Sequence, residues 1–228
     1  MKENKLLLVA LTLILFSSCS GTYKAYYQTL KIAFAEQVDA QKTLAEVQQS
    51  EVDIISVKRG DRPAAIMALA YLERGQHKWV SNDNAMLIMH KGRLIRSLGL
   101  SDNRLYLSNL GNDPLNFIAT NTPLEGIPST WFRYADRDGD EYGHPIRSSF
   151  SLPKEQTIQA LNLEVYSNYY VETVNYEAPA NYTRLNKSWK NHFWYSKDGE
   201  LIKSIQQISP VSEPLEVTYL SRIARLNQ

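Results

Sequence analysis

The sequence predicts a mainly β fold: a single domain of antiparallel β-meanders forming a curved sheet, a sandwich or a barrel-like sheet, with one or two N-terminal helices. Three observations predict it. The chain has 14 Tyr against 10 Gly, and aromatic and β-branched side chains pack well on pleated surfaces. Short runs of Ile, Val and Leu alternate with turn residues along most of the chain. No internal repeat or low-complexity linker divides the 228 residues, a length that suits one compact fold.

The composition narrows the class of protein further. Hydrophobic residues make up 43% of the chain and charged residues 21%, which is typical of a globular protein and excludes a disordered chain, a long coiled coil or a polytopic membrane protein. The 25 Lys and Arg residues nearly balance the 24 Asp and Glu residues, for a formal charge of +1. No overall field attracts nucleic acid, so we expect no nucleic-acid partner.

The first residues have the pattern of an export signal. Lys2 and Lys5 give a positive start, and an apolar run follows from Leu6 to Phe16. A helix needs roughly 20 residues to cross a hydrocarbon core about 30 Å thick, so this run is too short to be a stable membrane helix. We therefore predict a lipoprotein signal peptide over residues 1–18 and a single mature domain over residues 19–228.

Cys19 is the predicted lipidation site. Ser17 and Ser18 precede it as in a bacterial lipobox, although Phe16 stands where Leu is usual, and it is the only cysteine of the chain. We expect Cys19 to carry acyl chains, palmitate among them, because each buried CH₂ adds about 0.8 kcal/mol of membrane affinity. By analogy with other bacterial lipoproteins, Ser20 predicts an outer-membrane anchor with the domain facing the periplasm. The alternative is an ordinary signal peptide cut elsewhere.

The first half of the mature chain predicts helices and then a meander. Thr22–Gln49 has apolar residues at spacings of three and four and no Gly or Pro, which predicts one or two amphipathic helices packed on the sheet or docked on a partner. Ala64–Glu73 has some helix propensity, but it lies among short strands and turn residues flank it, so we predict a strand. The meander strands are Val52–Lys58, Ala64–Glu73, His77–Val80, Ala85–His90 and Leu94–Ser97.

The second half predicts longer strands. Leu100–Thr130 mixes Asn, Asp, Gly and Pro with short apolar pieces and is expected to be loop-rich. Asp198 and Gly199 predict a hairpin turn. The expected strands are Thr130–Arg137, Ile146–Phe150, Ile158–Ala178, Tyr182–Ser196, Leu201–Ser209 and Leu215–Leu226.

Two segments resemble a known family. His77–Leu100 reads HKWVSNDNAMLIMHKGRLIRSLGL, and Val57–Gly75 before it reads VKRGDRPAAIMALAYLERG. Together with the lipobox and with Trp131 and Trp194, they resemble the YjbF/GfcB family of outer-membrane lipoproteins associated with group 4 capsule and exopolysaccharide loci. The resemblance implies a non-catalytic accessory role in polysaccharide production or export, beside an outer-membrane β-barrel and periplasmic export proteins. It supplies no catalytic motif.

The residues themselves carry little sign of catalysis. Asp136–Glu141 resembles the start of an EF-hand loop, but Glu141 stands where Gly is needed and Arg147 where a bidentate Glu is needed. A calcium turn of another kind at Asp136, Asp138 and Asp140 stays an alternative to a hairpin whose carboxylates accept hydrogen bonds from backbone amides. The four histidines lie on different elements without zinc-ligand spacing, and no nucleophile elbow is present. We expect no enzyme, metal or cofactor.

Aromatic and basic residues supply the candidates for a binding surface. Flat rings stack on the apolar faces of sugars, although most rings of the second half are expected in the core or in cross-strand pairs. Two arginines of the family-like hairpin are expected at the surface, where they can guard a sheet edge or meet acidic sugars. The candidates for a glycan or partner surface are Trp131, Tyr166, Tyr169, Tyr170, Arg93 and Arg96.

These observations favour a lipid-anchored, non-catalytic accessory of capsule or exopolysaccharide export that contacts export proteins and the polysaccharide itself. One alternative is a carbohydrate-active enzyme with Asp136–Glu141 in its groove. Another is a carrier of lipid or lipoprotein with an apolar cavity closed by helices. The sequence does not identify the polysaccharide or the oligomeric state.

Overall fold

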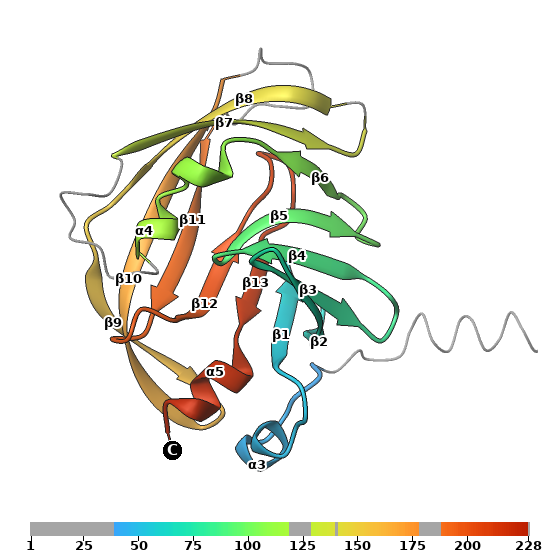
Figure 1. Ribbon diagram of the computed structural model, residues 1–228, viewed down its shortest axis with the longest axis vertical. Helices are drawn as coiled ribbons and strands as arrows, with labels where there is room; N and C mark the ends of the chain where they lie inside the picture. The colour runs from blue at the N-terminus through green and yellow to red at the C-terminus, as the bar shows by residue number, and fades with distance from the viewer. Residues whose placement is uncertain (1–38, 119–128, 140, 178–187, 228) are drawn as a thin grey trace, which may run out of the picture. The chain divides into compact units, whose positions relative to one another are not determined.

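Antiparallel strands dominate the structure, as the alternation of apolar runs and turns predicts. It is a computed structural model, and it describes residues 39–118, 129–139, 141–177 and 188–227. In this part of the chain thirteen strands form one sheet, accompanied by a few short helices (Figure 1). The mainly β fold class is therefore confirmed.

The first half of the sheet is the predicted meander. Each strand pairs antiparallel with the next, and the segment with helix propensity, Ala64–Glu73, forms the second strand. Residues with positive φ, including Gly75 and Gly92, make the tight turns. The five strands are β1 (Ile54–Arg59), β2 (Ala65–Glu73), β3 (Gln76–Ser81), β4 (Met86–His90) and β5 (Arg93–Leu98).

The second half adds eight strands. The region expected to be loop-rich holds one of them, together with a 3-10 helix η1 (Leu110–Asn112) and a short helix α4 (Leu115–Ile118). The eight strands are β6 (Arg104–Leu107), β7 (Thr130–Arg137), β8 (Glu141–Phe150), β9 (Lys154–Ala160), β10 (Leu163–Tyr176), β11 (Ser188–Tyr195), β12 (Leu201–Gln206) and β13 (Leu215–Thr218).

Two of the predicted long strands are wrong. Ile158–Ala178 is broken into β9 and β10 by a two-residue turn at Leu161 and Asn162, which both have positive φ. Such a turn matches the twist of an antiparallel hairpin, but Leu161 gives no sign of it in the sequence. Leu215–Leu226 leaves the sheet after β13 and forms helix α5 (Leu220–Arg225). The buried residues Leu220, Ile223 and Ala224 of α5 follow helical spacing.

The predicted N-terminal helices lie only partly in the described chain. Residues 22–38 are outside it, and α3 (Leu44–Gln48) lies within the predicted range. The helix begins at Thr43, whose hydroxyl accepts from the amide of Glu46 while the Glu46 carboxylate accepts from the amide of Thr43. Val47 of α3 packs with Leu220 and Ala224 of α5.

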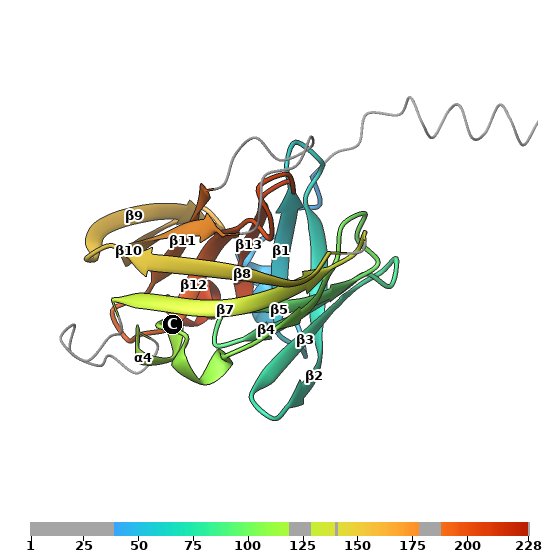
Figure 2. The ribbon, with the colours of Figure 1, turned by 90° about the horizontal axis from the view of Figure 1, so that it is seen from above.

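The sheet is nearly closed into a barrel. Its strand order is β5-β4-β3-β2-β1-β13-β12-β11-β10-β8-β7-β6, with β9 paired to β10. The first and last strands of this order, β5 and β6, lie side by side where the sheet curves back on itself (Figures 1 and 2). At this junction the amide of Arg104 on β6 donates to the Ser97 hydroxyl of β5 over 3.0 Å. A side chain thus takes the place of a ladder hydrogen bond.

Alternate residues of the barrel strands are buried. On β10 the buried row is Tyr170, Glu172, Val174 and Tyr176, as expected when successive side chains point to opposite faces of a strand. The largest apolar cluster includes Trp79, whose ring meets that of Tyr219 edge-to-face at 5.9 Å between centroids. The same buried rows also carry charged residues, which form the site described below.

Gly92 is expected to be much less replaceable than Gly139. Both have a φ of 88°, but a Cβ on Gly92 would collide with the buried side chain of Leu201, whereas a Cβ on Gly139 would meet nothing within 4 Å. We expect Gly92→Ala to lower the free energy of unfolding by about 2–4 kcal/mol, from left-handed strain and overpacking together. Gly139→Ala should cost about 1 kcal/mol. Urea unfolding checks this, and equal losses in the two variants would contradict it.

Candidate functional site

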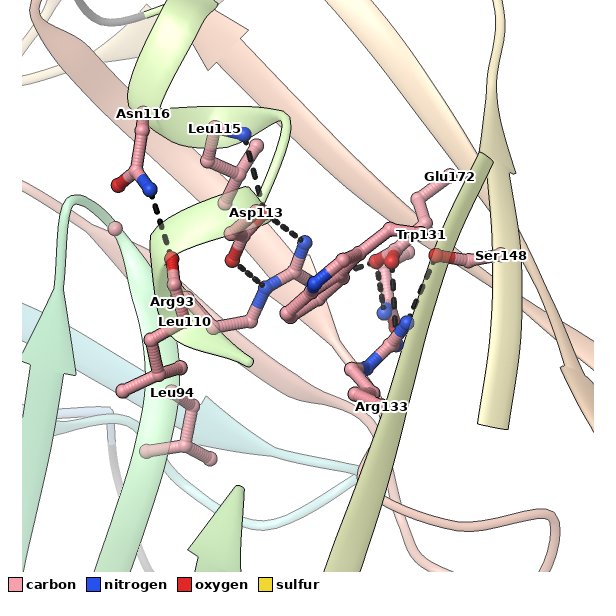
Figure 3. Close-up of polar contacts among 12 residues, drawn as sticks. Arg93, Leu94, Leu110, Asp113, Leu115, Asn116, Trp131, Arg133, Ser148 and Glu172 are labelled. Atoms are coloured by element: carbon pink, nitrogen blue, oxygen red, sulfur yellow. Dashed lines mark hydrogen bonds and ion pairs between the residues drawn. The ribbon is translucent and has the colours of Figure 1, made fainter. Parts of the chain in front are cut away.

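Four charged side chains meet in the interior of the barrel. Arg93, Asp113, Arg133 and Glu172 are each 3% exposed or less, and we call them the buried charged network (Figure 3). They come from β5, from the two-residue segment between η1 and α4, from β7 and from β10. Burying a charge is costly unless it is paired and hydrogen-bonded, so their contacts decide what this site can do.

Arg93 connects the two carboxylates of the network. Its Nε and Nη2 atoms donate to the two carboxylate oxygens of Asp113 over 2.8 and 3.0 Å, a bidentate geometry that guanidinium and carboxylate favour. Its Nη1 atom donates to Oε2 of Glu172 over 2.5 Å. One guanidinium therefore joins β5 to β10 and to the segment that leads into α4 (Figure 3).

The Glu172 carboxylate accepts hydrogen bonds from side chains on three other strands. Besides Arg93 it accepts from Nη2 of Arg133 over 3.2 Å and from Nδ2 of Asn191 on β11 over 2.8 Å. Nη1 of Arg133 donates to the hydroxyl of Ser148 on β8 over 2.8 Å. The Glu172 carboxylate thus links β10 directly to β5, β7 and β11, and through Arg133 to β8.

Aromatic rings flank the two guanidinium groups. The Arg133 guanidinium carbon lies 4.0 Å and that of Arg93 4.8 Å from the ring centroid of Trp131, and Arg93 also lies 5.2 Å from that of Phe193. A desolvated cation over an aromatic face is stabilised by the ring quadrupole. The indole Nε1 of Trp131 donates to the carbonyl of Asn109. Trp131 is therefore part of the interior packing.

Asp113 anchors the segment around α4. Its Oδ1 accepts from the amide of Leu115 over 3.1 Å while the carboxylate holds Arg93. Leu115 and Ile118 of α4 belong to the largest apolar cluster. The ion pair therefore fixes a non-strand segment against the barrel interior.

The electrostatics favour the charged forms in the centre of the network. Burial alone would raise the pKa of Glu172, but Arg93 and Arg133 outweigh it and lower that pKa to about 2. Burial alone would lower the pKa of Arg93, but Asp113 and Glu172 raise it above its ordinary value. A carboxylate held ionised between two guanidiniums is a poor general acid or base near neutral pH. The arrangement is suited to holding elements together.

Three of the predicted surface candidates are buried. Arg93 was expected at the surface, but its charge is compensated by carboxylates that are distant in sequence. Trp131 is 1% exposed and Tyr170 is 9% exposed. These three residues belong to the interior, and their placement at a surface is corrected.

The other candidates lie on the outside. Arg96 and Tyr166 are exposed. The ring of Tyr169 stacks on that of Trp194 at 4.9 Å between centroids, and its hydroxyl shares a hydrogen bond with Nδ1 of His192 over 2.5 Å. Tyr166 therefore remains accessible to a ligand, whereas Tyr169 is engaged with its neighbours.

The acidic turn binds backbone and amide groups. Oδ1 of Asp136 accepts from the amide of Gly143 over 2.6 Å, and Oδ2 of Asp138 accepts from Nδ2 of Asn103 over 2.7 Å. Asp140 and Cys19 lie outside the described residues. Within the described ranges, no three His, Cys, Asp or Glu side chains gather as metal ligands do, and no helix has the length and apolarity to cross a membrane.

The outer face of β6 and β7 carries an aromatic patch that the sequence analysis missed. Tyr106 and Tyr134 are 55% and 47% exposed, and Phe132 meets Tyr134 edge-to-face at 5.1 Å between centroids. The guanidinium of Arg147 lies 5.4 Å from the Phe132 ring. Tyr106, Phe132, Tyr134 and Arg147 are called the outer aromatic patch.

Two hollows of the described chain have linings of mixed polarity. A cavity of about 190 Å³, the Arg59 cavity, is lined by Arg59, Arg62, Leu94, Leu100, Ser101, Asp102, Gln206, Ile208, Val211, Ser212, Glu213 and Leu215. A larger groove of about 470 Å³ includes Lys58, Lys203 and Glu216 in its lining. Both are lined by polar and charged as well as apolar groups, unlike the apolar cavity that a lipid carrier needs.

Comparison with known proteins relates the chain to lipoproteins. The family model described as "Group 4 capsule polysaccharide lipoprotein gfcB, YjbF" matches residues 27–220. The uncharacterized lipoprotein GfcB of Escherichia coli (strain K12) is 27% identical over 217 residues, 94% of this chain and 97% of the relative. The uncharacterized lipoprotein YjbF of the same organism is 26% identical over 223 residues, 96% and 98% of the two chains.

A solved structure has the same fold. The crystal structure of the hypothetical lipoprotein YmcC from Escherichia coli (K12) matches with a TM-score of 0.67 and 28% sequence identity, over 85% of this chain and 93% of that one. The nearly closed β-sheet is therefore shared with a lipoprotein.

Glu172→Gln is expected to destabilise the protein strongly. The substitution keeps the shape of the side chain but leaves Arg93 and Arg133 without their shared carboxylate, and breaking a buried pair in this way costs about 3–5 kcal/mol. Glu164→Gln is the matched control, because Glu164 lies on the same strand and is exposed. Chemical unfolding measures both. Similar free energies of unfolding in the two variants would contradict a central role for the network.

Proposed function

The chain belongs to the YjbF family of group 4 capsule polysaccharide lipoproteins, and we propose that it is a non-catalytic accessory of capsule or exopolysaccharide production, anchored to the outer membrane through Cys19. The resemblance seen in His77–Leu100 and Val57–Gly75 to this family is thus confirmed. The observation that carries the proposal is that the family match includes all strands of the barrel.

The anchor is supported by the sequence around Cys19. The lipobox-like Ser17 and Ser18 precede the only cysteine of the chain. Acyl chains on Cys19 would hold the protein at the membrane and raise its effective concentration near export partners, so that weak contacts become occupied.

The absence of catalysis is supported by the state of the interior carboxylates. Glu172 and Asp113 are both bound to Arg93, and glycoside hydrolysis needs two carboxylates that face a substrate across a groove. Asp136 and Asp138 accept from backbone and amide groups of the protein itself. The barrel is therefore proposed to act through its surface, towards a β-barrel of the outer membrane, periplasmic export proteins and the polysaccharide.

The outer aromatic patch is the proposed contact with the polysaccharide. Exposed rings of Tyr106 and Tyr134 lie on neighbouring strands, so their faces can pack on successive sugar units. The guanidinium of Arg147 beside them is paired with the carboxylate of Glu177 over 2.8 Å, so the aromatic rings carry the proposed contact.

Loss of the anchor is expected to abolish function in the cell. In a deletion strain, the native gene should restore surface polysaccharide, whereas a version with Cys19→Ser and an ordinary signal peptide should not, because it loses its concentration at the membrane. Surface and periplasmic polysaccharide are measured, with immunoblotting to show equal amounts of protein. Equal rescue by the soluble version would contradict the tethering mechanism, and unchanged polysaccharide in the deletion strain would contradict the accessory role.

Removal of the outer aromatic patch is expected to weaken polysaccharide binding. Tyr106→Ala combined with Tyr134→Ala should lower affinity for the purified polysaccharide about tenfold, since each ring contributes about 0.5–1.5 kcal/mol. Tyr71→Ala is the control, because Tyr71 is 61% exposed on a different part of the sheet. Calorimetry measures binding, with thermal unfolding as a check on folding. An equal loss in the control, or no binding by the unaltered protein, would contradict this contact.

A further inference from the structure

The hairpin formed by β2 and β3 projects beyond the end of the barrel (Figure 2). All six residues 70–75 at its end are exposed, and we call them the β2–β3 tip. β1 pairs with β2 only from Ala65 to Ala68. In the described chain the tip therefore has a partner strand on one side alone, and that strand is β3.

Both faces of the β2–β3 tip carry a large apolar side chain. Tyr71 and Leu72 are 61% and 67% exposed, and they point to opposite faces because they are successive residues of a strand. Leu72 lies opposite His77, which shares its face of β3 with the buried Trp79. The face that is covered inside the barrel is thus open at the tip. Exposed apolar side chains gathered at one projecting end indicate a contact surface.

Two turns bring cations together at this end of the barrel. Arg74 lies in the turn between β2 and β3 and Lys91 in the turn between β4 and β5, and both are exposed. The turns are neighbours, because a Cβ on Gly75 would lie 3.8 Å from the ring of His90. Within the described ranges neither of the two cations takes part in an ion pair, so both are available to an anionic partner.

The one carboxylate of the β2–β3 tip does not cancel this charge. Glu73 is already paired with Lys78 on β3. Burial and the positive charge of Arg222 lower the pKa of His77, which shows that a further cation acts at this end of the barrel. The tip therefore combines exposed apolar side chains with an excess of positive charge.

We propose that the β2–β3 tip contacts an anionic membrane surface. Tyr71 and Leu72 enter the boundary between headgroups and acyl chains, where an apolar body with a polar hydroxyl is well suited. Arg74 and Lys91 meet the lipid phosphates. The chain belongs to a family of lipoproteins, so a membrane is its expected neighbour. This contact goes beyond the proposed function, because it is a second membrane contact besides Cys19 and gives the barrel one orientation.

Tryptophan fluorescence tests the contact. Each of the four native tryptophans is 8% exposed or less and gives a constant background. In the mature chain with Cys19→Ser, Leu72→Trp should shift its emission to shorter wavelength in phosphatidylglycerol vesicles, because the indole leaves water. It should also lose intensity when the acyl chains carry bromine. Leu152→Trp is the matched control, since Leu152 is 72% exposed between β8 and β9, and it should show neither change.

Two results of this experiment overturn the proposal. Emission of the Leu72→Trp protein that vesicles leave unchanged would assign the tip to solvent or to a protein partner. Equal quenching in the Leu72→Trp and Leu152→Trp proteins would show adsorption without a preferred surface. The Cys19→Ser chain carries no acyl chains, so either result leaves the proposed anchor untouched.

Charge variants test the two cations of the turns. Arg74→Gln combined with Lys91→Gln should weaken binding of the Cys19→Ser chain to phosphatidylglycerol vesicles by about fivefold for each cation removed. Lys154→Gln combined with Lys190→Gln is the matched control, because these lysines are exposed on β9 and β11 and the change in net charge is the same. Vesicle sedimentation measures binding. Equal weakening in the two double variants overturns the proposal, since binding would then follow net charge alone.

Discussion

The contact between Arg93 and Glu172 is the interaction on which the rest of the barrel depends. Arg93 lies on β5, the first strand of the sheet order, and Glu172 lies on β10, close to its other end. β5 and β6 meet through a hydroxyl of Ser97 in place of a ladder bond. The ion pair across the interior supplies a connection that the backbone does not make at this junction, and through Asp113 it also holds the segment around α4.

The buried charged network contributes to the specificity of the fold as well as to its stability. Well-packed apolar side chains are often as stabilising as a buried ion pair, because desolvation offsets much of the Coulomb attraction. The buried charged network adds a geometric requirement. The bidentate contact with Asp113 and the three hydrogen bonds to Glu172 need one particular arrangement of the strands that carry them. A barrel whose first and last strands, β5 and β6, meet without a continuous ladder needs such a constraint on its register.

The sequence predicted the parts of the fold that are determined locally. The meander β1–β5 follows from apolar runs and Gly-containing turns, which act over a few residues. The turn at Leu161 and Asn162 and the helix α5 were missed because neither carries a Gly or Pro signal, and tertiary packing decides both. Arg93 was misplaced for a similar reason, since the carboxylates that bury it lie 20 and 79 residues away. The row Tyr170–Glu172–Val174–Tyr176 was a usable signal: one carboxylate alternates there with residues of an inward face.

The distances along the chain between these partners have a consequence for how the protein folds. β1 pairs with both β2 and β13. The pairing of this first strand is therefore complete only when β13, the last strand of the chain, is present. The guanidinium of Arg93 likewise stays in contact with water until β10, which carries Glu172, has joined the sheet. Contacts of such long sequence separation are closed late and slowly, and a partial chain has no way to bury its own arginine. The barrel is therefore a structure that forms only once the whole polypeptide is present, an order of events compatible with a chain that crosses a membrane before it folds.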